Sequence, residues 1–125
     1  MRNFIATIIL LHLPLVVYSQ DSPLEGIYSV LVPNESAYAT VQVKGNEVII
    51  MLLYNDGWEP YVGTVDGNVI TAAGVTAIVG VDVKISASLS TPSILSITID
   101  SCSGVTEGND CLFPPGYVLQ AFKVW

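Results

Sequence analysis

Turn-forming residues recur along this chain about every eleven residues, and each group lies between two apolar runs. The groups are Asn34-Glu35-Ser36, Lys44-Gly45-Asn46, Asn55-Asp56-Gly57 and Asp66-Gly67-Asn68. This interval is typical of hairpins in an antiparallel meander, whereas a helix needs apolar residues three and four positions apart. The pattern therefore predicts an all-β fold.

The apolar runs between these turns predict about eight short strands. Their expected ranges are Gly26 to Val32, Ala37 to Val43, Val48 to Tyr54, Trp58 to Val65, Asn68 to Ala73, Thr76 to Leu89, Ile94 to Ser101 and Tyr117 to Val124. Strands in this order favour an up-and-down barrel over a two-sheet sandwich, because closure removes the unpaired edges. A barrel of this size is filled by side chains or holds one small ligand.

The apolar residues are arranged differently in different strands. Apolar and polar residues alternate over 79–89 and 94–100, which predicts one buried and one solvated face. The run from Val48 to Leu53 is apolar on both faces, and the last strand nearly so. The second face of such a strand needs cover from a loop, a sheet, a ligand or a partner chain. A period of two does not decide which face lies inside.

The first nineteen residues, Met1 to Ser19, have the composition of a secretory signal peptide. Arg2 gives a positive start, an apolar run follows, and Val17-Tyr18-Ser19 suits cleavage before Gln20. A membrane anchor is the alternative, but a spanning helix needs about 20 apolar residues. We therefore expect residues 20–125 to form a single domain, secreted or periplasmic.

Cleavage at this point would remove His12 and Arg2, the only histidine and the only arginine. Three lysines and eleven carboxylates would remain, so the net charge would be 3 − 11 = −8. So acidic a chain disfavours nucleic acids and anionic membranes as partners. Without the usual general base or a recognisable nucleophile, we expect neither catalysis nor a cofactor.

Two cysteines, Cys102 and Cys111, enclose eight residues near the C-terminus. In an oxidising compartment this spacing predicts a structural disulfide, and the pair does not form a Cys-x-x-Cys redox motif. The loop acids Asp100, Glu107 and Asp110, with Asn109, do not match the spacing of a 12-residue calcium loop. A zinc site would lack histidine ligands, because the only histidine would leave with the signal peptide. We expect no metal site.

One group of residues combines aromatic rings with carboxylates around a single predicted hairpin: Tyr54, Asp56, Trp58, Glu59 and Tyr61. Rings that stack on sugar faces, beside acids that accept hydroxyl protons, form a candidate ligand site. Turn chemistry with aromatic cross-strand pairs is the simpler interpretation of the same residues. Pro60 predicts an edge, a bulge or an early strand break, which would place the hairpin near a barrel rim, where pockets usually lie.

These features support an exported, non-catalytic barrel that binds a small apolar or sugar-like ligand or a protein partner. The alternative is an assembly protein whose two-sided apolar strands form a homo-oligomer interface. A secreted hydrolase inhibitor also fits a small stapled barrel, and the C-terminal Trp125 leaves open a small outer-membrane barrel. Asn34 begins an Asn-Glu-Ser sequon in a predicted turn and is a candidate glycosylation site.

Overall fold

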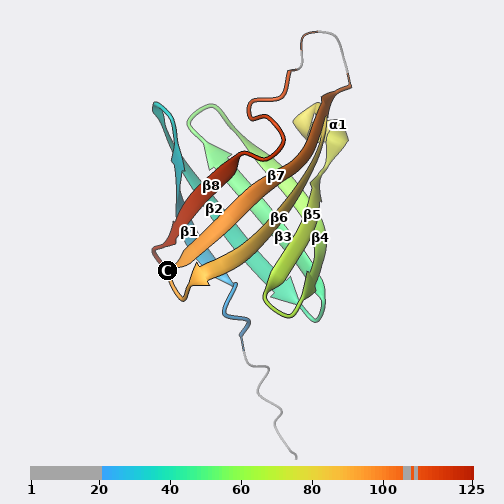
Figure 1. Ribbon diagram of the computed structural model, residues 1–125. Coiled ribbons are helices and arrows are strands. Elements are labelled where there is room, and N and C mark those ends of the chain that lie inside the picture. The colour runs from blue at the N-terminus through green and yellow to red at the C-terminus, as the bar shows by residue number, and fades with distance from the viewer. Residues whose placement is uncertain (1–20, 106–107, 109) are drawn as a thin grey trace, which may run out of the picture.

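The computed structural model, which describes residues 21–105, 108 and 110–125, is a closed up-and-down β-barrel (Figure 1). Its strands are β1 (Gly26–Val32), β2 (Glu35–Lys44), β3 (Glu47–Tyr54), β4 (Gly57–Asp66), β5 (Val69–Gly74), β6 (Val81–Thr91), β7 (Ile94–Gly104) and β8 (Val118–Lys123). Each pairs antiparallel with its neighbours in sequence, and β1 pairs with β8. The predicted barrel is confirmed, whereas the predicted signal peptide, Met1 to Ser19, lies outside the described residues.

The predicted start of the sixth strand, at Thr76, is wrong. Thr76–Val79 forms a single helical turn, α1, and β6 begins only at Val81. Gly80 ends the turn with a left-handed φ of 80°, and its N–H donates to the carbonyl of Thr76. This turn lies in the connection from β5 to β6, and the alternation of apolar residues, which starts at Val79, gives no sign of it.

Apolar side chains from all eight strands fill the barrel. In β3 the inward residues are Val48, Ile50 and Leu52, while Ile49 and Leu53 are exposed on the outside. The sequence left open which face of β3 is buried. In the structure it is the face that carries Val48, Ile50 and Leu52. The polar residues that alternate along β6 and β7 point outward, as predicted.

The segment before β1 closes one end of the barrel. Leu24 is fully buried, and its carbonyl accepts a hydrogen bond of 2.8 Å from the Tyr28 hydroxyl. The Lys123 ammonium donates to the carbonyl of Pro23 over 2.9 Å. Because these contacts tie the segment to β1 and β8, we place the opening of the barrel at its other end.

At that other end, a bulge in β7 turns a cysteine toward the interior. Ile85 pairs with Ile99 and Lys84 with Ser101, so Asp100 is an extra residue on β7. An extra residue reverses the face on which the following side chains lie. Cys102, which opposes the buried Val83, therefore faces inward.

The predicted disulfide between Cys102 and Cys111 is present, with 6.0 Å between the Cα atoms. It closes a loop that leads from β7 back toward β8 at the open end of the barrel (Figure 1). A disulfide of this kind fits an oxidising compartment.

Replacing both cysteines by serine is expected to lower the free energy of unfolding by about 2.5 kcal/mol, because the unfolded chain regains the entropy of a short closed loop. For a domain of this size, that corresponds to a melting temperature lower by roughly 10–20 °C. Thermal unfolding followed by circular dichroism measures the change, with the exposed Ser101→Ala as control. A shift no larger than the control's would contradict a stabilising role for the disulfide.

Candidate functional site

A cavity of about 210 Å³ lies inside the barrel at the disulfide end. Aliphatic side chains such as Val83, Ile97 and Leu119 form its wall, and Phe113 and the disulfide residue Cys102 line it near the loop. A dry cavity of about 150 Å³ holds benzene, whereas pockets for drug-sized ligands measure about 300–1,000 Å³. The space therefore suits one ring with a few additional atoms.

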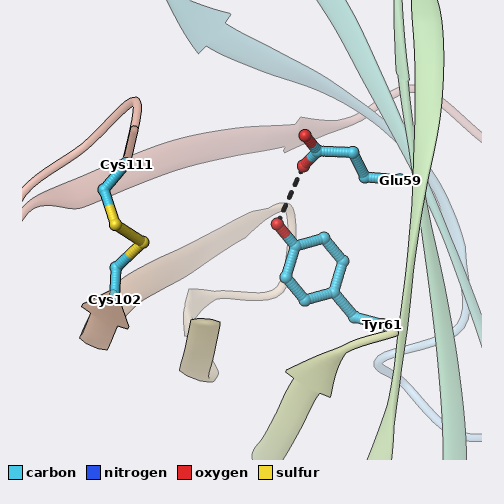
Figure 2. The surroundings of a disulfide bond; sticks show 4 residues. All are labelled: Glu59, Tyr61, Cys102 and Cys111. Carbon is cyan, nitrogen blue, oxygen red and sulfur yellow. Dashed lines mark hydrogen bonds between the residues drawn. A yellow bond between two sulfur atoms is a disulfide. The ribbon is translucent and has the colours of Figure 1, made fainter. Parts of the chain in front are cut away.

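One polar cluster faces this cavity and consists of Tyr54, Glu59 and Tyr61. The Tyr61 hydroxyl donates to Oε2 of Glu59 over 2.9 Å, and the Tyr54 hydroxyl reaches the same oxygen over 3.5 Å. Figure 2 shows the Tyr61 hydroxyl directed at the Glu59 carboxylate, with the disulfide across from this pair. Alternation explains the arrangement, since Glu59 and Tyr61 are two positions apart in β4 and pair with the buried Leu52 and Ile50.

Both hydroxyls of the cluster stay protonated far above neutral pH. Burial is the main cause that raises the pKa of Tyr54 and Tyr61, and the negative charge of Glu59 raises both further. A protonated phenol has one hydrogen to donate. In each case that hydrogen is directed at Glu59, so the cluster turns lone pairs rather than donors toward the cavity.

The structure brings together three of the five predicted ligand-site residues. Asp56 lies on the exposed β3–β4 turn, and Trp58 points outward with 50% of its surface exposed. Trp58 pairs with Leu53 across the two strands, which is a cross-strand pair of one aromatic and one aliphatic residue. The rings and carboxylates near this hairpin thus divide between the two sides of the barrel wall.

Of the edge, bulge or strand break that Pro60 predicted, the strand break is absent, because β4 continues through this residue. Pairing of β4 with β5 begins one residue later, at Tyr61, and the Pro60 carbonyl accepts from the N–H of Val75. Within a strand, the carbonyl and the nitrogen of one residue point to the same side. The nitrogen of Pro60, which carries no hydrogen, therefore faces β5 at a position before the β4–β5 ladder begins. Proline thus removes no hydrogen bond from that ladder.

Sequence reasoning missed the residues that β6, β7, β8 and the disulfide loop contribute to the cavity. The segment Phe113-Pro114-Pro115-Gly116 gave only a turn signal, yet Phe113 lines the cavity and stacks on Tyr117 with 4.7 Å between ring centroids. Phe113 follows the second cysteine by two residues, and this short distance was the one sequence feature that could have linked Phe113 to the disulfide end of the barrel.

The candidate glycosylation site is a surface position. Asn34 is exposed at the β1–β2 turn with a φ of 61°, so the sequon stays a candidate for modification. Within the described part of the chain, no group of three or more histidine, cysteine or acidic residues could hold a metal ion. Glu107 and Asn109, weighed as calcium ligands, lie outside it. No described helix has the length and apolar character needed to cross a membrane.

Comparison with models of protein families, with curated proteins and with solved structures found no match. The function proposed below therefore rests on the cavity and on the outer surface of the barrel.

Proposed function

We propose that this chain is a non-catalytic binding protein that holds one small, mainly apolar ligand in the cavity at the disulfide end of the barrel. A single observation carries the proposal: an apolar cavity of about 210 Å³ with one polar cluster on its wall. Apolar walls with a few convergent polar groups are the usual composition of small-molecule sites. Export with cleavage before Gln20 belongs to the same proposal, and the disulfide is compatible with it.

The lining of the cavity supports binding rather than catalysis. Among the described lining residues there is no histidine, lysine, serine or threonine. The lining cysteine, Cys102, is bonded to Cys111 and therefore offers no free thiol as a nucleophile. A sugar-like ligand has less support than an apolar one. Sugars need hydrogen-bond donors and acceptors on several sides, whereas here the polar groups lie mainly on one wall of the cavity. Trp58, a ring that could stack on a sugar, lies outside the barrel.

Filling the cavity should weaken binding while the barrel stays folded. Val81→Phe places a larger side chain against the cavity, and Val62→Phe makes the same exchange on the outer face of β4. Using benzyl alcohol as the probe in ligand-detected NMR, we expect binding at least tenfold weaker in the first variant and unchanged in the second. Native mass spectrometry of protein exported with its own leader would show any ligand retained from the host.

Thermal unfolding of both variants verifies that they are folded. Equal binding of benzyl alcohol to Val81→Phe and to the unmodified protein would place the site elsewhere. No binding to the unmodified protein would contradict the proposal.

A second candidate function, self-association, is favoured by the outer side of β2, β3 and β4. Five neighbouring side chains there are each 41–50% exposed; together they are called the outer apolar face and are Tyr38, Ile49, Leu53, Trp58 and Val62. Apolar patches of this kind mark interaction sites. A second copy is a suitable partner, because the face carries no charged side chain that would repel its counterpart.

An outer-membrane barrel has less support. Transmembrane barrels turn apolar residues toward lipid and polar residues toward the lumen. Here Asp82 and Lys84 are exposed on the outside of β6, and the interior is apolar. For a hydrolase inhibitor, the described loops offer no observation in its favour.

A further inference from the structure

We infer that the ligand of this cavity is a small organic ammonium ion with an apolar body, whose N–H groups bind Glu59. The inference rests on the proposed binding function and adds the chemical class of the ligand. It follows from the donors and acceptors of the polar cluster, from the charges around it and from the shape of the wall.

The cluster offers acceptors and no uncommitted donor. The hydroxyl hydrogens of Tyr54 and Tyr61 are both directed at Oε2 of Glu59. The other carboxylate oxygen of Glu59 accepts no hydrogen bond from any described residue, and each phenol oxygen keeps lone pairs. A ligand that meets this cluster must therefore donate. An ammonium group brings up to three N–H donors, and hydrogen bonds between charged groups are the strongest type.

No protein cation neutralises Glu59 in the described structure. Lys44 and Lys84 are exposed outside the barrel, and Lys123 binds the Pro23 carbonyl at the closed end. A second carboxylate, Asp110, lines the cavity near the disulfide loop. A carboxylate beside apolar walls is stabilised by an opposite charge, and a cationic ligand would provide one. The excess of acids over bases in the whole chain also attracts cations.

The rest of the wall selects an apolar body. Val83, Ile97 and Leu119, which line the cavity from β6, β7 and β8, offer only aliphatic surface. The rings of Tyr61 and Phe113 also line the space and provide faces suited to a cation. With about 210 Å³ available, one ring or a short branched chain fits beside the ammonium group. Anionic ligands such as carboxylates would meet Glu59 without a donor to bind them.

The test compares benzylamine with benzyl alcohol, which have nearly the same shape and differ in charge. At neutral pH we expect isothermal titration calorimetry to show at least tenfold tighter binding of the amine. Glu59→Gln should weaken amine binding at least tenfold and change alcohol binding less than twofold. The control Glu47→Gln removes the same charge from an exposed position of β3 and should leave the preference intact.

The outcomes separate this inference from the proposed function. Equal binding of amine and alcohol to the unmodified protein would overturn the ammonium inference and leave the cavity function standing. Absence of binding for both compounds would overturn both. An equal loss in Glu47→Gln and Glu59→Gln would show a long-range charge effect and overturn the assignment to Glu59.

A measurement on the unmodified protein keeps the test decisive if Glu59→Gln does not fold. With ¹³C-labelled glutamate, the carboxyl resonance of Glu59 should shift at least twice as far on addition of benzylamine as on addition of benzyl alcohol. A resonance that moves equally with both compounds, or with neither, would contradict the inference.

Discussion

Gly63→Ala is expected to remove a large part of the stability of this barrel, although it adds only one methyl group. Gly63 lies in β4 directly opposite Ala72 of β5. A Cβ at this position would overlap the carbonyl oxygen of Thr71 and lie 2.5 Å from the Cα of Ala72. Both are backbone atoms, so no change of rotamer relieves the overlap, and the two strands must separate. We expect a loss of more than about 3 kcal/mol, against a total of about 5–15 kcal/mol for a typical domain.

Gly57→Ala is the matched control for this prediction. It makes the same substitution in the same strand, where an added Cβ meets nothing within 4 Å. Gly57 also has no positive φ, so alanine fits its backbone, and the expected change is within about 0.5 kcal/mol. Urea unfolding followed by circular dichroism compares the two variants. Similar midpoints for both would show that β4 and β5 do not approach as closely as described.

Local patterns in the sequence explain why the strands could be predicted. Turn groups such as Lys44-Gly45-Asn46 and Asp66-Gly67-Asn68 fall at the hairpins between β2 and β3 and between β4 and β5. Each hairpin depends on a few adjacent residues, so a single sequence carries the information. The range predicted for β1 agrees with the structure at both ends. Closure of the sheet by β1 and β8 was expected because it removes unpaired edges.

The features that shape the site depend on contacts between distant segments. The bulge at Asp100 is set by pairing with β6, yet it decides that Cys102 faces the cavity. The helical turn at Thr76–Val79 lies in the connection from β5 to β6, and its last residue, Val79, packs against the barrel core. For the ligand site, composition grouped Trp58 with Glu59, whereas alternation places adjacent strand residues on opposite faces. Applying that alternation to β4 would have separated them before the structure was known.

Strand β3 has no polar residue between Val48 and Leu53 to mark its outer face. Lysine substitutions at two adjacent positions therefore test which face points outward. Ile50→Lys places an ammonium group inside the barrel, where Ile50 is fully buried. An unpaired buried charge costs about 3–5 kcal/mol, so this variant should be largely unfolded. Ile49→Lys introduces the same charge at an outward position that is 47% exposed, and it should stay folded. Urea unfolding of the two variants measures the contrast, and equal destabilisation would contradict the assigned faces.

The folded Ile49→Lys variant also separates self-association from the ligand-binding function. If the outer apolar face joins two copies, the unmodified protein should sediment as a dimer and Ile49→Lys as a monomer, because each dimer would bury two unpaired ammonium groups. Ile78→Lys, on α1 and 52% exposed, makes the same exchange away from this face and should stay dimeric. A monomeric unmodified protein across the concentration range, or equal dissociation of both variants, would refute assembly through this face. Benzyl alcohol binding should be the same in Ile49→Lys and in the unmodified protein, since Ile49 lies on the outer side of the barrel wall.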